Sequence, residues 1–123
     1  MKKLFLHIFA AFFASFAFAQ QPAVTAILDT NHILIGEQTV LHVRAANLKS
    51  TANIVWPAWP DTLKGVEVVS SSRDTSEENG IFAIEEHFVL TSFDSGVAII
   101  PPFVVLVEDQ KLETEPAILN VGT

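Results

Sequence analysis

Residues 90–103 read Leu90-Thr-Ser-Phe-Asp-Ser-Gly-Val-Ala-Ile-Ile-Pro-Pro-Phe103 and contain the clearest fold signal in the chain. One apolar segment leads into this stretch, and Asp94-Ser-Gly96 supplies the residue types of a tight turn before a second, β-branched segment. Pro101 and Pro102 cannot donate backbone hydrogen bonds, so the second strand must stop there. The stretch therefore predicts two strands joined by a short turn.

The remainder of residues 20–123 continues this pattern. Apolar and polar residues alternate with a period of two, Val, Ile, Thr and Phe are common, and turn residues recur about every ten positions. Besides the strands within 90–103, we expect strands at 24–28, 38–45, 54–56, 66–69, 82–90, 103–107, 112–114 and 118–121. No helix is expected after residue 20. We predict an all-β, immunoglobulin-like antiparallel β-sandwich of about seven to nine short strands over residues 20–123.

Two of the expected strands have a recognisable inner face. It comprises Thr39, Leu41, Val43 and Ala45 in one strand and Phe82, Ile84, Phe88 and Leu90 in the other. Glu86 interrupts the second face, and burying an unpaired carboxylate is costly. We therefore expect either that Glu86 lies at the sheet margin in water or that a β-bulge near Glu85 shifts the register.

A longer loop is expected before residue 81. Asn79-Gly80 is the strongest local hairpin signal in the chain. The polar stretch from Ser70 to Glu78 precedes it and lacks the alternation of a half-buried strand. We therefore expect a mobile loop that is longer than the two residues of a tight hairpin.

The first 19 residues have the organisation of a cleavable signal peptide. Lys2 and Lys3 provide the positive start, and the run from Leu4 to Phe18 is apolar except for His7 and Ser15. This run is shorter than the roughly 20 residues that span a membrane. Ala17-Phe-Ala19 supplies small residues at the two positions that signal peptidase reads. We predict cleavage before Gln20 and export of a single domain, residues 20–123.

Charge and cysteine content narrow the function classes. Without Lys2 and Lys3, five of the seven Lys and Arg residues remain against fourteen Asp and Glu, so the net charge falls from −7 to −9. This sign disfavours phosphate backbones, and we expect no nucleic-acid partner. The chain has no cysteine, so the lipid attachment of bacterial lipoproteins is excluded. A domain of about 100 residues can be stable by burial alone.

Three groups of residues together resemble a known family. They are Val24 to Thr30 with Ile35-Gly-Glu-Gln-Thr39, Trp59-Pro-Asp-Thr-Leu63 with Gly65-Val-Glu-Val68, and Leu90 to Phe103. In order and spacing they are similar to the N-terminal immunoglobulin-like domain of BatD-type aerotolerance proteins of Bacteroidetes-like bacteria. The resemblance covers nearly all of residues 20–123. One departure is Ala98, where such domains more often have an aromatic residue.

The resemblance implies a cell-envelope protein without catalytic activity. Its partners would be other envelope proteins of a Bat-like complex, which include proteins with von Willebrand type A domains and repeat proteins. Family members are usually longer and end in a transmembrane anchor, and no such segment occurs up to Thr123. We therefore expect either a fragment or a truncated relative. The expected location is the periplasm or cell envelope of a Gram-negative bacterium.

The binding candidates are aromatic and apolar. Trp56 and Trp59 lie within five residues beside two prolines, an arrangement that could present an aromatic platform to a sugar. Core packing is the simpler role for both indoles, and burial of Trp59 would argue against the platform. The segment Phe103 to Val107 has five consecutive apolar residues, more than one buried face requires, so Phe103 and Val105 are candidates for contact with a partner protein.

Metal and catalytic signals are weak. Of the histidines that remain after cleavage, His87 shares a strand face with Glu85, but no third ligand is near in sequence. We predict no metal site and no cofactor. Ser70 to Ser72 precede Arg73 and Asp74 without a Gly-x-Ser-x-Gly motif or an adjoining histidine. We predict no catalytic residue and no enzymatic activity.

The sequence thus favours a protein-interaction module of an envelope assembly. Two alternatives remain, a carbohydrate-binding sandwich that uses Trp56 and Trp59, and a structural spacer. A fold by itself does not distinguish these functions. The sequence indicates no oligomeric state.

Overall fold

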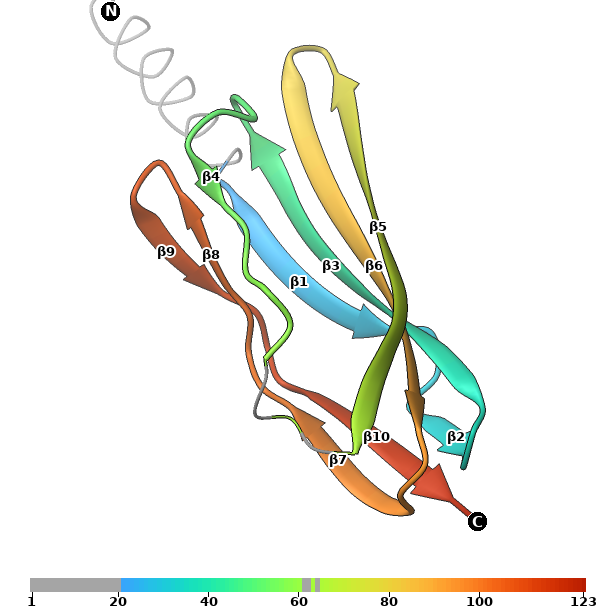
Figure 1. Ribbon diagram of the computed structural model, residues 1–123. Helices are drawn as coiled ribbons and strands as arrows, with labels where there is room; N and C mark the ends of the chain where they lie inside the picture. Colours follow the sequence, from blue (N-terminus) through green and yellow to red (C-terminus); the bar gives the residue numbers. More distant parts are fainter. Residues whose placement is uncertain (1–20, 61–62, 64) are drawn as a thin grey trace, which may run out of the picture.

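The computed structural model describes residues 21–60, 63 and 65–123, and in this part of the chain it contains ten β-strands and no helix (Figure 1). The strands are β1 (Ala23–Leu28), β2 (His32–Leu34), β3 (Gln38–Leu48), β4 (Ile54–Val55), β5 (Val66–Glu78), β6 (Ile81–Ser92), β7 (Gly96–Ile100), β8 (Val104–Val107), β9 (Gln110–Glu113) and β10 (Ala117–Gly122). The predicted all-β class is confirmed. The predicted signal peptide lies outside the described residues. No described helix has the length and apolar character needed to cross a bilayer.

One layer of the sandwich is a four-stranded sheet in the order β1-β3-β6-β5, with antiparallel neighbours. Figure 1 shows these four strands side by side. The β3–β6 register is regular from the pair Gln38 and Thr91 to the pair Ala45 and Ile84. The predicted inner face of β3 is confirmed, because Thr39, Leu41, Val43 and Ala45 are all buried.

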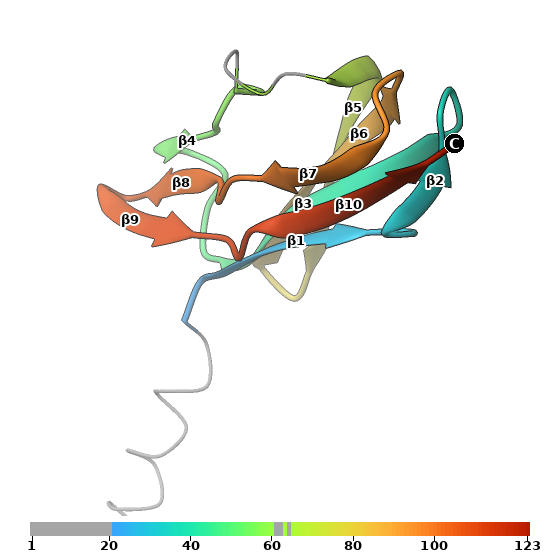
Figure 2. The same ribbon diagram turned by 90° about the horizontal axis from the view of Figure 1, so that it is seen from below.

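The second layer consists of two three-stranded sheets, β4-β8-β9 and β2-β10-β7. Pro101-Pro102 separates β7 from β8, and Pro116 precedes β10. β7–β8 and β9–β10 are therefore the two arms of one long hairpin, each interrupted where the two sheets meet. Figure 2 shows β7 and β8 in line, with β9 and β10 beside them. With the interrupted strands joined, the layers correspond to the ABED and CFG sheets of an immunoglobulin-like sandwich.

Two features of this layer differ from the expectation. The short strand β2 was not predicted, and it pairs with β10 in parallel, whereas every other pairing is antiparallel among the described residues. β2 has three residues with only Ile33 buried, so it carries too little alternation to be recognised in sequence.

Hydrogen bonds between the two arms resume directly after the two prolines. Neither proline can donate a ladder hydrogen bond, and the chain resumes pairing at Phe103. The Phe103 N–H donates to Thr114 Oγ1 at 2.8 Å, and the Thr114 N–H donates to the Phe103 carbonyl at 2.9 Å. Thr114 is buried. This residue therefore holds the two interrupted arms together at the break.

The core consists of two adjoining clusters between the layers. The larger one contains Leu41, Val43, Phe88 and Leu90 from the first layer and Ile100, Phe103, Leu119 and Val121 from the second, together with Ile33 and Val66. The smaller one contains Ala45, Leu48, Ile84, Val105 and Val107. Trp56 packs against both clusters. Side chains from both layers thus meet as the sandwich prediction requires.

Glu86 belongs to the inner face, and both sequence expectations for it were wrong. The β3–β6 register shifts only between Ala45 and Leu48, beyond the regular pairs of Glu85 with Arg44 and Glu86 with Val43, so the irregularity does not turn Glu86 outward. The Glu86 side chain is 11% exposed. It is paired instead, since Arg73 lies directly opposite on β5 and its Nε donates to Glu86 Oε2 at 2.6 Å. The Arg73 guanidinium also lies 5.3 Å from the centre of the Trp56 ring. The carboxylate is tolerated because it is paired.

The expected loop over 70–78 is also wrong. β5 continues through this polar stretch, paired with β6 as far as Glu78 opposite Ile81, and the turn consists of Asn79 and Gly80 alone. Both residues have positive φ, 54° and 79°, as a two-residue type I′ hairpin requires. The polar side chains occur because residues 70–78 are exposed on both sides of the strand. Hydrogen bonding to β6 therefore keeps this segment extended, although its sequence lacks the alternation of a half-buried strand.

Gly80→Ala provides a test of this turn. A Cβ at position 80 would meet no atom within 4 Å, so the cost comes only from the positive φ. We expect the free energy of unfolding to fall by about 1 kcal/mol, measured by urea denaturation. Gly80→Asn should lose less, because asparagine tolerates this conformation. Equal stability of Gly80→Ala and the wild type would contradict the two-residue turn.

Candidate functional site

The two tryptophans lie against the core. Trp56 follows β4 and is half-buried, with its Nε1 buried and without a hydrogen-bond partner among the described residues. Trp59 is half-buried, and its ring centre lies 5.3 Å from that of Phe88 and 6.0 Å from that of Phe103. These contacts correspond to the core-packing role. An aromatic platform for a sugar needs an exposed ring face, which these rings use for packing.

Phe103 and Val105 do not offer their side chains to a partner. Both are buried, Phe103 in the larger core cluster and Val105 in the smaller one. Val104 and Leu106 point the other way and are half-buried. The five-residue apolar run therefore arises from a strand whose outward side chains are partly buried as well, and the sequence assigned the contact role to inward-facing side chains.

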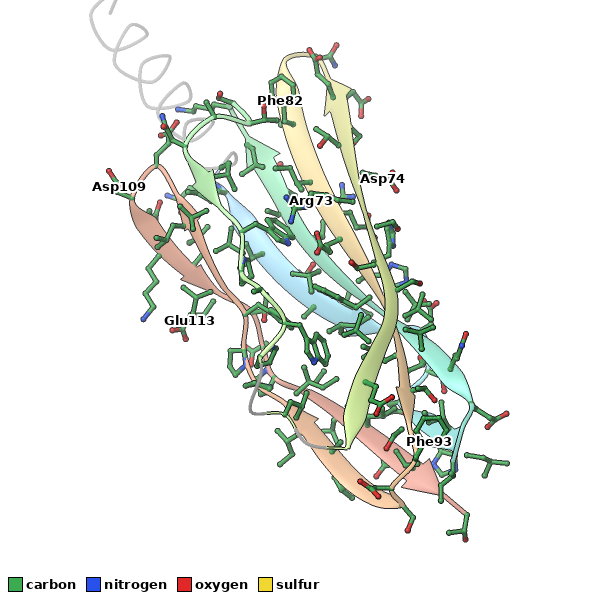
Figure 3. All side chains as sticks on the ribbon, in the orientation of Figure 1. Arg73, Asp74, Phe82, Phe93, Asp109 and Glu113 are labelled. Carbon is green, nitrogen blue, oxygen red and sulfur yellow. The ribbon has the colours of Figure 1, made fainter. Side chains whose placement is uncertain are left out.

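An apolar surface does occur on the outer side of the β2-β10-β7 sheet. We call Leu34, Val97, Ile99 and Ile118 the apolar face. Ile118 lies opposite Ile99 in the ladder, and both are exposed, as are Val97 and Leu34. Val97 is 67% exposed and Ile99 61%. Phe93, in the turn that leads into β7, is exposed as well (Figure 3).

Among the described residues, the outward positions of β7, β10 and β2 hold no Asp, Glu, Lys or Arg. The remaining outward positions of β10 and β2 in register with the apolar face are Asn120, Gly122 and His32. Among the described residues β7 pairs only with β10. Sheet edges in monomeric proteins usually carry charges or bulges that prevent further pairing. β7 instead exposes Val97 and Ile99, and exposed apolar side chains that adjoin one another are typical of a surface that contacts another protein.

A polar group of side chains lies on the opposite outer side of the sandwich. His42 of β3 is directly opposite His87 of β6, and Glu85 is two residues from His87 on the same face. One ligand atom from each of the three lies within 4.8 Å of the others, and we call these residues the imidazole cluster. The two Nδ1 atoms are 2.8 Å apart, and Glu85 Oε1 is 3.2 Å from His42 Nδ1.

Further charged groups surround the imidazole cluster. Asp29 Oδ1 lies 2.7 Å from His42 Nε2, and Asp74 Oδ2 lies 3.3 Å from His87 Nε2. Arg44 Nη1 lies 3.2 Å from Glu85 Oε2. Figure 3 shows Arg73 and Asp74 leaving β5 on opposite sides, so Asp74 reaches this outer surface while Arg73 points inward. Sequence inspection missed the cluster because it depends on the β3–β6 register.

The same surface brings a serine near a histidine without forming a catalytic pair. Ser72 is paired in register with His87. The described hydrogen bonds include none between the Ser72 hydroxyl and this ring, whose two nitrogens lie against His42 and Asp74. The hollow beside Arg44, Asn47 and the β5–β6 hairpin is lined by no histidine. A nucleophile and a general base are therefore not brought together at either place.

Comparison with known proteins adds no family assignment. No protein-family model matches the chain, and a search of curated proteins gives no match either.

Proposed function

We propose that this protein is a non-catalytic interaction module of the cell envelope that binds another protein through the apolar face. The observation that carries the proposal is the exposure of Val97, Ile99 and Ile118 on one side of β7 and β10. The partner offers an apolar strand or sheet surface, because the face presents no charge to pair with. The resemblance to BatD-type domains supports a partner from a Bat-like assembly in the periplasm or envelope.

Strand addition beside β7 is the mode of contact that suits this surface. Such binding combines main-chain hydrogen bonds with packing of alternate side chains. β7 supplies two alternate apolar side chains, Val97 and Ile99, which lie opposite Asn120 and Ile118 of β10. The packing of Trp56 and Trp59 against the core gives no comparable support to carbohydrate binding.

Ile99→Lys tests the proposal. The position is exposed, so the fold should tolerate the lysine, with a change in unfolding free energy within about 0.5 kcal/mol. A charge in an apolar contact costs binding energy, and we expect a loss of at least about tenfold in recovery of the partner from solubilised envelopes. Val55→Lys is the matched control, because Val55 is similarly exposed on β4.

The identity of the recovered protein is the second readout of this experiment. Mass spectrometry should find a von Willebrand type A or repeat protein in the wild-type and Val55→Lys samples and not with Ile99→Lys. Equal recovery with both lysine variants would contradict a role for the apolar face. Self-association of the purified protein through this face, detected by light scattering, would also contradict the proposal.

A further inference from the structure

The imidazole cluster presents three electron-pair donors to one point. A carboxylate oxygen accepts and does not donate hydrogen bonds. The contact of Asp29 with His42 Nε2 at 2.7 Å therefore places the proton of that ring on Nε2. Asp74 Oδ2 lies 3.3 Å from His87 Nε2, an ion-pair contact that does not set the tautomer of that ring. The lone pair of neutral His42 is then on Nδ1.

The His42 Nδ1 lone pair points toward His87. The Nδ1 atoms are 2.8 Å apart beside the Glu85 carboxylate. The His42 lone pair and the Glu85 carboxylate therefore converge on one point beside His87. This point holds either the Nδ1 proton of His87, donated to His42 Nδ1, or a metal ion bound by all three residues.

We propose that the imidazole cluster binds a zinc ion through His42 Nδ1, His87 Nδ1 and Glu85 Oε1. Two histidines and one glutamate are a ligand set that zinc uses, with the fourth position open to water or to another ligand. Imidazole ligands suit zinc, copper and nickel, and they disfavour magnesium and calcium. Asp29 and Asp74 supply the carboxylates that orient metal-bound histidines from behind.

The three ligand atoms already lie within 4.8 Å of one another. Nitrogen atoms at about 2.0–2.1 Å from one tetrahedral zinc ion stand about 3.3 Å apart. Glu85 Oε1 is already 3.2 Å from His42 Nδ1. The two Nδ1 atoms must separate by about 0.5 Å, which side-chain rotation supplies on an outer sheet surface. The side chains of His42, Glu85 and His87 are 26–28% exposed, so an ion can reach them from solvent.

The cluster lies on the outer side of the β1-β3-β6-β5 sheet, and the apolar face lies on the outer side of the other layer. Zinc binding is therefore independent of the proposed protein contact. Its failure would leave that contact untouched, and the reverse holds as well.

Isothermal titration calorimetry with zinc chloride tests the site. The purified protein must carry no histidine tag and must first be stripped of metal with a chelator. We expect saturable binding of one zinc ion per chain and an increase in melting temperature, since a ligand that binds only the folded state stabilises it. Magnesium and calcium should give neither effect.

Variants separate the proposed site from adventitious binding. His42→Gln and His87→Gln should each weaken zinc binding by more than about 100-fold, and Asp29→Asn by about 10- to 100-fold. His32→Gln is the matched control and should bind zinc like the wild type, because His32 lies on β2 in the other layer. Circular dichroism establishes that each variant is folded.

The outcomes that overturn the proposal are equally definite. One is the absence of saturable zinc binding by the wild type. Another is binding that His42→Gln and His87→Gln leave unchanged. A third is a nitrogen-15 spectrum of the histidine rings that shows a shared Nδ1 proton which zinc does not displace.

Discussion

Replacing Leu41 by alanine should lower the free energy of unfolding by about 3 kcal/mol. The Leu41 side chain is fully buried, lies opposite Phe88 in the β3–β6 ladder and belongs to the larger core cluster that joins the two layers. Truncation removes apolar burial and leaves a cavity between the sheets. A domain of this size has a total stability of about 5–15 kcal/mol, so the loss is a large fraction of it.

Chemical denaturation of the purified protein measures this effect. Ile27→Ala is the matched control, because Ile27 is on the neighbouring strand β1 and is 63% exposed. It should change the unfolding free energy by no more than about 0.5 kcal/mol. Similar losses for the two variants would contradict the assignment of the inner and outer faces of the first layer.

The second large effect concerns the ion pair inside the sandwich. Arg73→Met should lower the free energy of unfolding by about 2 kcal/mol, because it leaves the Glu86 carboxylate without a partner on the inner face. Removing one partner of a fully buried pair costs about 3–5 kcal/mol. The expected loss is smaller here because the Arg73 side chain is 51% exposed and water screens the pair.

A double-mutant cycle distinguishes the pair from simple packing loss. Arg73→Met combined with Glu86→Leu should recover most of the lost stability, since an apolar pair can replace a buried ion pair. Arg44→Met is the matched control. Arg44 on β3 pairs with Glu85, the neighbour of Glu86 on β6, but this pair lies on the outer face of the sheet. It should cost less than about 1 kcal/mol. A larger cost for Arg44→Met than for Arg73→Met would contradict the burial of Glu86.

The sequence predicts most of the fold because burial on one face leaves a readable alternation. β3 is the clearest example, with four buried side chains at every second position from Thr39 to Ala45. β5 shows the limit of this signal, because residues 70–78 are exposed on both sides and are held by pairing with β6. Alternation therefore cannot reveal such a strand, although Asn79-Gly80 marks its end.

The candidate sites were harder to predict because both depend on which strands are neighbours. Glu85 and His87 are two apart in sequence, but His42 joins them only through the register of β3 against β6. Val97 and Ile99 become part of a larger apolar surface only when β10 adds Ile118 beside them. Phe103 and Val105 had the stronger apolar signal, yet a strand whose outward side chains are partly buried carries that signal too.

Photo-crosslinking in intact cells tests the central claim, contact with a partner through the apolar face, most directly. A benzophenone amino acid in place of Ile99 should form one dominant adduct with another envelope protein, and the same group in place of Val55 should not. Identification of a von Willebrand type A or repeat protein in the Ile99 adduct is the predicted result. The absence of any adduct at position 99, or the same adducts at positions 99 and 55, would contradict the account.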